Sequence, residues 1–229
     1  MHRVSTIDGE LPLLVVAPHG SDDARTDIIT EVIAKEIDAY AVINHGWKRA
    51  QKVDIWKDHA NCNHIPHLFE DVVKEEFLDP ITRYVNKIER EYGFVLMLIV
   101  HGVGNYIRTL ANDPSLDMII GYGAGNPASY SCEPRLKDAL IYYLHKEGIT
   151  AYEGTAGSKF AGRAKNNLNQ FFRRWKPRNL VQSIQVEIVH ELRENAEICE
   201  LTGQTIASVV DDMLLIDDAT DISYIPKKF

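Results

Sequence analysis

Short apolar runs alternate along the chain with amphipathic segments of helical period. The unbroken apolar runs at residues 13–17 and 94–100 predict strands buried on both faces, since a half-exposed strand would alternate apolar and polar residues. Between them, isoleucine and valine recur at helical spacing from about residue 26 to residue 38, after aspartate and threonine residues that are capping candidates. This alternation predicts an α/β protein with a mainly parallel sheet covered on both faces.

The same pattern continues through the rest of the chain. Strands are expected at about residues 40–44, 118–120, 150–153 and 183–189, and helices at about 71–92, 134–147 and 195–214. Pro80 should kink or split its helix because proline cannot donate the interior hydrogen bond, and Gly93 should end that helix. The run at 94–100 is the most hydrophobic and should be the central strand. Residues 46–70 form a polar, histidine-rich loop long enough to suggest a function.

Composition narrows the class of protein. The 229 residues are 45% hydrophobic and contain no linker-like stretch or repeat, so we expect one domain over residues 1–229. The net charge of -8 argues against nucleic acid or an anionic membrane as partner. Without a signal-like start or an apolar run near the roughly 18 residues that a membrane helix requires, the expected location is the cytoplasm. The three cysteines form no CxxC pair, which disfavours a disulfide framework.

Two segments place a histidine and a glycine at the end of a buried strand. They are VVAPHGSDD, which contains His19, and LMLIVHGVGN, which contains His101. In open α/β sheets the ligand site lies beyond the carboxyl ends of the strands, so both imidazoles should reach the same edge. Asp22 or Asp23 could complete the two-histidine, one-carboxylate set of a catalytic zinc site. The alternative is that either histidine is only a hydrogen-bonded turn residue.

Glu187 interrupts the apolar strand pattern of SIQVEIVHELRE. A carboxylate buried in such a run is costly unless it is paired, hydrogen-bonded or functional. Period-two alternation puts Gln185 and Val189 on the same face of the strand as Glu187, so the Glu187 side chain should point into a partly polar space. It is therefore a candidate general base and acid, and the alternative is an edge-strand glutamate facing water.

Two further polar segments leave their roles open. The loop HANCNHIPH offers four potential metal ligands that match no tight zinc motif, so it is either a structural metal site or a solvated loop near the substrate. These ligands are His59, Cys62, His64 and His67. Arg163, in AGRAKNN, could grip a substrate carboxylate with its planar fork, or it could belong to a solvated loop.

In chain order, PHGSDD, WKRAQKVD, VHGVGN, IIGYGAG, KFAGRAKNN and IQVEIVHELRE resemble the N-formylglutamate amidohydrolase family over roughly residues 11–195. That family looks like a relative of the zinc carboxypeptidases and of the aspartoacylase and succinylglutamate desuccinylase deacylases. The motifs are short, and their order and strand contexts carry the specificity. The resemblance implies a phosphorylase/hydrolase-like α/β fold, a three-layer sandwich with a mixed, mainly parallel central sheet.

The resemblance also implies roles for individual residues. By the match at PHGSDD, His19 would be the first metal ligand, and Asp22 or Asp23 the acidic one. The match at VHGVGN would make His101 the third ligand, and QVEI would make Glu187 the catalytic carboxylate. The implied cofactor is zinc or another divalent transition metal.

The implied substrate is a small molecule that bears a carboxylate, which Arg163 would bind during catalysis. The other substrate-binding candidates are Arg49, Asn105 and Asn166. Arg49 and Asp54 fall where the family has an arginine and an aspartate before an Asn-Arg pair, but Ile55 and Trp56 follow here. That departure weakens the implication that formylglutamate itself is the substrate.

These inferences predict a zinc-dependent amidohydrolase that cleaves the C–N amide bond of a small N-acyl amino acid, with Glu187 taking and returning the proton. The alternatives are a metallo-carboxypeptidase or deacylase acting on another amide, and a non-catalytic binding protein with the same fold. A serine hydrolase using Ser21 or Ser131 ranks below these because neither residue lies in a G-x-S-x-G elbow. The acyl group, the amine, the physiological metal and any homo-oligomeric state are left open.

Overall fold

A seven-stranded mixed sheet forms the centre of the computed structural model, which describes residues 3–20, 22–46, 74–164, 167–173 and 180–215. The strands are β1 (Val4–Ile7), β2 (Leu13–Ala17), β3 (Tyr40–Asn44), β4 (Val95–Val103), β5 (Met118–Gly121), β6 (Ala151–Glu153) and β7 (Val181–Val189). Their order across the sheet is β1-β3-β2-β4-β7-β5-β6. Only the β1–β3 and β5–β7 pairs of this sheet are antiparallel. The expected mixed, mainly parallel sheet is confirmed, with β4 at its centre.

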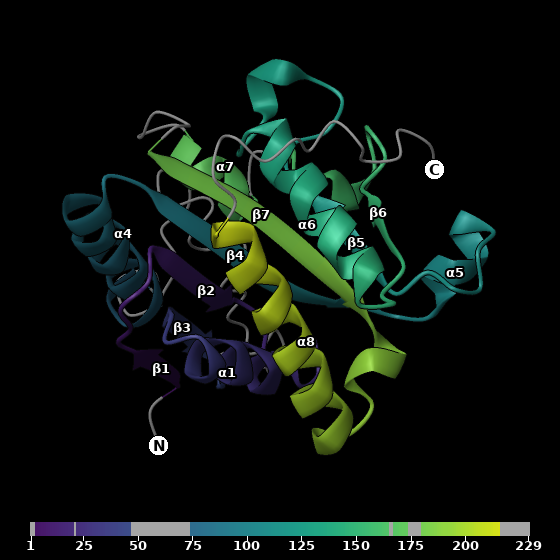
Figure 1. Cartoon of the computed structure of the whole chain (residues 1–229), viewed down its shortest axis with the longest axis horizontal. Coiled ribbons are helices and arrows are strands. Elements are labelled where there is room, and N and C mark those ends of the chain that lie inside the picture. The colour runs from purple at the N-terminus through teal and green to yellow at the C-terminus, as the bar shows by residue number, and fades with distance from the viewer. Residues whose placement is uncertain (1–2, 21, 47–73, 165–166, 174–179, 216–229) are drawn as a thin grey trace.

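Helices cover both faces of the sheet, as Figure 1 shows for α6 and α8 on the nearer face. The α-helices are α1 (Thr26–Glu36), α4 (Asp79–Tyr92), α5 (Tyr106–Ala111), α6 (Pro134–Lys146), α7 (Leu168–Arg173) and α8 (Ala196–Leu214). Side chains from α1, α6 and α8 share one core cluster with one face of the sheet, and those from α4 and α7 share another with the opposite face. The expected three-layer sandwich is therefore confirmed.

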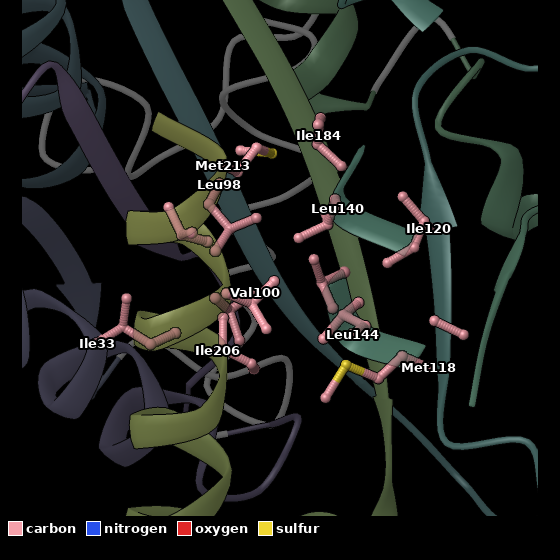
Figure 2. Packing of buried hydrophobic residues seen from close by; sticks show 14 of the residues in the cluster. Ile33, Leu98, Val100, Met118, Ile120, Leu140, Leu144, Ile184, Ile206 and Met213 are labelled. Atoms are coloured by element: carbon pink, nitrogen blue, oxygen red, sulfur yellow. The ribbon is translucent and has the colours of Figure 1, made fainter. Parts of the chain in front are cut away.

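The larger core cluster lies between the sheet and the α1, α6 and α8 layer. In Figure 2, Leu98 and Val100 of β4 face Ile206 and Met213 of α8, and Ile184 of β7 lies near α6. These side chains are at most 3% exposed, and burying a side chain of this size contributes about 1.5–3 kcal/mol. Because alternate residues of β4 point to opposite faces, residues 96, 98 and 100 enter this core while His101 belongs to the other face.

Pro80 divides the helical segment where the sequence predicts a break. A π-helical turn, η2 (Lys74–Leu78), precedes α4, and Pro80 occupies the first turn of α4, where its missing N–H is tolerated. Gly93 ends α4 in the left-handed conformation with φ of 79°. Three short elements, β1, α5 and α7, were not predicted, because segments of four to six residues carry too little periodicity to be recognised.

The remaining elements are four helical turns: η3 (Pro127–Ser129), η4 (Lys159–Ala161), η5 (His190–Arg193) and the η2 turn described above. In the part of the chain that the structure describes, no helix is both long enough and apolar enough to span a bilayer. The assignment of residues 1–229 to one domain and the cytoplasmic location stay predictions.

Candidate active site

Two neighbouring parallel strands, β2 and β4, bring the two predicted histidines to one edge of the sheet. His19 follows the end of β2 by two residues, and His101 lies near the carboxyl end of β4. Their ring centres are 5.3 Å apart, and the residues are only 7% and 6% exposed. On the next strand, β7, Glu187 is the direct register partner of His101. The predicted convergence of two imidazoles and a carboxylate is present.

Both histidines are followed by a glycine because the backbone at each point has no room for a side chain. A Cβ on Gly20 would lie 2.5 Å from the Asn44 carbonyl oxygen, and one on Gly102 would lie 2.5 Å from the Arg193 guanidinium carbon. Real Cβ atoms essentially never approach so closely. The repeated His-Gly pair is therefore a packing requirement of this edge.

Asp23 is the acidic side chain that reaches the histidines. Its Oδ2 lies 3.2 Å from His101 Nδ1 and accepts a hydrogen bond from the Gly102 N–H at 3.3 Å. Burial would raise the pKa of Asp23, but the hydrogen bond and charge of His101, with the charge of His19, outweigh it and lower that pKa. Burial would lower the pKa of His101, but the Asp23 hydrogen bond and the charges of Glu187 and Asp23 raise it overall. Asp22 is exposed and does not line this site.

The pairwise distances among His19, Asp23 and His101 are compatible with a shared cation. An ion about 2.0–2.1 Å from two imidazole nitrogens at a tetrahedral angle would hold the ring centres about 5.2 Å apart and two donor atoms about 3.3 Å apart. The corresponding separations here are 5.3 Å for the His19 and His101 rings and 3.2 Å for Asp23 Oδ2 and His101 Nδ1. However, no three His, Cys, Asp or Glu side chains among the described residues already form a complete metal-binding group. A side-chain adjustment would be needed to bring all three donors together.

Glu187 is held by a chain of side-chain amides. Gln185 Nε2 donates to Glu187 Oε1 at 3.2 Å and to the Phe160 carbonyl at 3.1 Å, while Asn167 Nδ2 donates to Gln185 Oε1. Burial raises the pKa of Glu187, opposed by the charge of His101. The carboxylate is thus oriented and more basic than one in water.

These groups line a cavity of about 260 Å³. Lys159 is the only lysine or arginine among the described residues that line it. Its Nζ donates to the Tyr106 hydroxyl at 3.0 Å and lies 4.9 Å from the centre of the Phe160 ring. An exposed lysine at the wall of the cavity can attract an anionic ligand group.

Arg193 joins the loop after β2 to the ends of β4 and β7, next to the candidate metal ligands. The residue is 4% exposed and donates to four backbone carbonyls. Its NH1 group donates to Asp23 and Ala24, its NH2 group to Val103 and its Nε to Ile188, at 2.7–3.1 Å. Because these carbonyls belong to the loop after β2 and to the ends of β4 and β7, one guanidinium fixes the relative positions of all three strand ends.

Comparisons of sequence and of structure give different results. No protein-family model and no curated protein matches the sequence. Among solved structures, the N-formylglutamate amidohydrolase from Ralstonia eutropha JMP134 has a TM-score of 0.62 at 15% identity, covering 93% of this chain and 99% of that chain. The chain shares the fold of that amidohydrolase. The resemblance drawn from the motifs is thereby confirmed at the level of the fold.

Two other solved structures share this fold at lower similarity. A bacteriophage poly-gamma-glutamate hydrolase has a TM-score of 0.53 at 12% identity, covering 92% of this chain and 88% of that chain. A metallo-carboxypeptidase from Burkholderia cenocepacia has a TM-score of 0.53 at 10% identity, covering 92% of this chain and 60% of that chain. Solved proteins that share this fold therefore include an N-formylglutamate amidohydrolase, a poly-gamma-glutamate hydrolase and a metallo-carboxypeptidase.

Several other predicted residues lie away from the cavity or outside the described residues. Arg163 is exposed and does not line the cavity, and its guanidinium lies near Gly125. Asn105 is exposed and accepts a hydrogen bond from the Glu191 N–H at 3.3 Å. Ser131 is buried, and its hydroxyl donates to the Ser183 carbonyl. The predicted residues outside the described ranges are Ser21, Arg49, Asp54, Ile55, Trp56, His59, Cys62, His64, His67 and Asn166.

Sequence reasoning missed Lys159, Tyr106 and Arg193. The first two lie in irregular or short helical segments, where no periodicity indicates which side chains face the cavity. Arg193 follows β7 closely in the segment VHELRE, and a charged residue there reads equally well as a solvated turn. Its burial depends on three strand ends meeting, which no local pattern encodes.

Proposed function

We propose that this protein is a metal-dependent hydrolase that cleaves the C–N amide bond of a small N-acyl amino acid. The observation that carries the proposal is the meeting of His19, Asp23 and His101 beside the half-buried Glu187 in one cavity. The fold adds support, since its solved relatives include an amidohydrolase and a metallo-carboxypeptidase.

In this proposal, His19, Asp23 and His101 hold the cation. The donor set of two imidazoles and one carboxylate suits zinc and leaves a coordination position open. When bound, such an ion acts as a Lewis acid toward the substrate carbonyl and the attacking water. Asp23 stays ionised at neutral pH, since its pKa is lowered, and so supplies the negative charge that the site needs.

Glu187 acts as the general base and then as the general acid. Its carboxylate takes a proton from the attacking water and returns it to the leaving amine nitrogen as the C–N bond breaks. The raised pKa of Glu187 favours both steps, because a carboxylate more basic than one in water accepts the proton more readily and still releases it to an amine. Gln185 and Asn167 keep the carboxylate in position.

Lys159 binds the carboxylate of the amino-acid half of the substrate. Arg163 was predicted for this role, but Lys159 lines the cavity and Arg163 does not. A lysine at the wall offers a flexible ammonium with three donors, which suits a substrate that enters and leaves. The Tyr106 hydroxyl, bonded to Lys159, offers a second contact for the same carboxylate.

The test combines elemental analysis with an activity screen on N-formyl and N-acetyl amino acids. Hydrolysis should require zinc, cobalt, manganese or nickel, stop with a chelator and return on adding the metal back. Glu187→Gln should lower kcat by about two to four orders of magnitude while the metal content stays unchanged. Glu200→Gln, an exposed change of the same chemistry on α8, should have no effect. Full activity of Glu187→Gln would exclude its role, and no hydrolysis with any of these metals would exclude the proposed function.

A further inference from the structure

A second cavity, of about 230 Å³, adjoins the candidate active site. Phe160 lines both cavities, and α5 contributes to both, through Tyr106 to the catalytic cavity and through Ile107 and Leu110 to the second. The second cavity is mainly apolar, with Leu116, Ile119 and Tyr152 among its lining residues. An engineered apolar cavity of about 150 Å³ admits benzene, so this cavity has room for a leucine-sized or phenyl side chain.

The register of the sheet fixes how near this cavity is to the reacting groups. His101 on β4 pairs with Glu187 on β7, Glu187 pairs with Ile119 on β5, and Ile119 pairs with Tyr152 on β6. Paired residues on neighbouring strands point to the same face, at about 4.8 Å per strand. Along this row of paired residues, the proposed catalytic Glu187 is followed on the next strand by the apolar Ile119. The second cavity therefore begins about one side chain away from Glu187.

The charges around the second cavity disfavour an acidic occupant. None of the described residues that line it is a lysine or an arginine. Glu153 is also a lining residue, but its carboxylate is bonded to Lys137 Nζ at 2.9 Å and to the Tyr122 hydroxyl at 3.3 Å, which belong to the α6 side of the sheet. A glutamate side chain of a substrate would enter the mainly apolar cavity without a counter-charge from any described lining residue, which is costly. Thr155 and Ser158 add only neutral hydroxyl groups.

We propose that the second cavity binds an apolar side chain on the amino-acid half of the substrate, which makes N-acyl derivatives of leucine, methionine or phenylalanine the preferred class. This inference rests on the proposed function and narrows its substrate. Lys159 lines the catalytic cavity, while its chain neighbours Ser158 and Phe160 line the apolar one. An α-amino acid carries its carboxylate and its side chain on one carbon, so a cation and an apolar cavity side by side match both groups at once.

The experiment measures kcat/KM of the metal-loaded enzyme on N-formyl and N-acetyl derivatives of leucine, methionine, phenylalanine, glycine, glutamate and lysine. The apolar substrates should exceed the glutamate derivative by at least about tenfold. Leu110, which is 72% exposed at the cavity, can be replaced without disturbing the core. Leu110→Arg should lower kcat/KM for leucine substrates by about tenfold and raise it for glutamate substrates. Leu215→Arg, at a leucine 75% exposed beyond the end of α8, is the matched control and should change neither.

The outcomes separate this inference from the proposed function. Hydrolysis that favours glutamate over leucine would leave the proposed function standing and overturn the apolar subsite. A preference for apolar substrates that Leu110→Arg leaves unchanged would place the specificity elsewhere and also overturn it. Absence of hydrolysis on every substrate with every metal would exclude the proposed function and the inference together.

Discussion

Replacing Arg193 by methionine removes the group that joins the three strand ends at the candidate active site. The substitution keeps a side chain of similar length but leaves four carbonyls without their donor, those of Asp23, Ala24, Val103 and Ile188. Because Arg193 is 4% exposed, water cannot replace the guanidinium without a rearrangement of these loops.

The expected loss of stability follows from the hydrogen bonds. A hydrogen bond to a charged group contributes about 1.5–3 kcal/mol, so four independent bonds would sum to about 6–12 kcal/mol. That sum is an upper bound because the four bonds share one donor and the loops can relax. A buried acceptor left unsatisfied costs about 1–3 kcal/mol, so with partial relaxation of the loops we expect a loss of about 3–5 kcal/mol for Arg193→Met. Against a total of about 5–15 kcal/mol for unfolding, the loss would be large.

Urea unfolding of the metal-free protein measures this loss. Arg193→Lys keeps the charge but not the planar fork, so it should be destabilised less, yet its metal affinity should fall about 10–100-fold because Asp23 loses its support. Arg90→Met, an exposed arginine on α4, is the control and should change stability by less than about 0.5 kcal/mol. If Arg193→Met were as stable as this control, or Arg193→Lys kept full metal affinity, Arg193 would not hold the three strand ends in place.

Two further predictions concern the acidic group of the site. Asp23→Ala should weaken zinc binding at least about 100-fold, whereas Asp22→Ala should not; equal effects in a calorimetric titration would contradict the choice of Asp23. In the metal-free protein, the lowered pKa of Asp23 stabilises the fold above about pH 4, and the raised pKa of His101 stabilises it below about pH 6.5. The stability advantage of the wild type over Asp23→Asn should therefore be largest between these values and shrink toward pH 3 and pH 8.5 in urea unfolding; a pH-independent difference would contradict the pairing.

Much of the scaffold could be predicted from local patterns. The unbroken apolar runs of β2 and β4 identify strands buried on both faces, and the parallel order then places His19 and His101 at the same edge. Period-two alternation puts Gln185 on the face of Glu187, and the hydrogen bond between them confirms that orientation. These inferences succeed because each depends on a repeat of two or on strand direction alone.

The remaining features depend on tertiary contacts that no local pattern contains. Asp22 and Asp23 are indistinguishable by spacing, and the turn after β2 sets where each side chain lies. In that turn the N–H groups of both residues donate to the His19 carbonyl, and the Asp23 side chain contacts His101 and lines the cavity. The sequence likewise does not show which of Arg163 and Lys159 lines the cavity, because both lie in one glycine-rich segment. The folded turn η4 is what puts Lys159 at the cavity.

Under the proposed function, the sheet register separates the residues that would carry out the reaction from those that would select the substrate side chain. The groups proposed for catalysis come from the ends of β2, β4 and β7, where Gly102 and Arg193 leave little freedom for substitution. The adjoining cavity is built by β5, β6 and α5, which neither supply those groups nor contact the Arg193 guanidinium through any hydrogen bond found among the described residues. Substitutions there can alter the side chain that fits without moving the reacting groups. A fold shared at 15% identity over 93% of the chain is compatible with such a division. The packed ends of β2, β4 and β7 would restrict which residues can stand there, while the residues that line the adjoining cavity could differ between proteins.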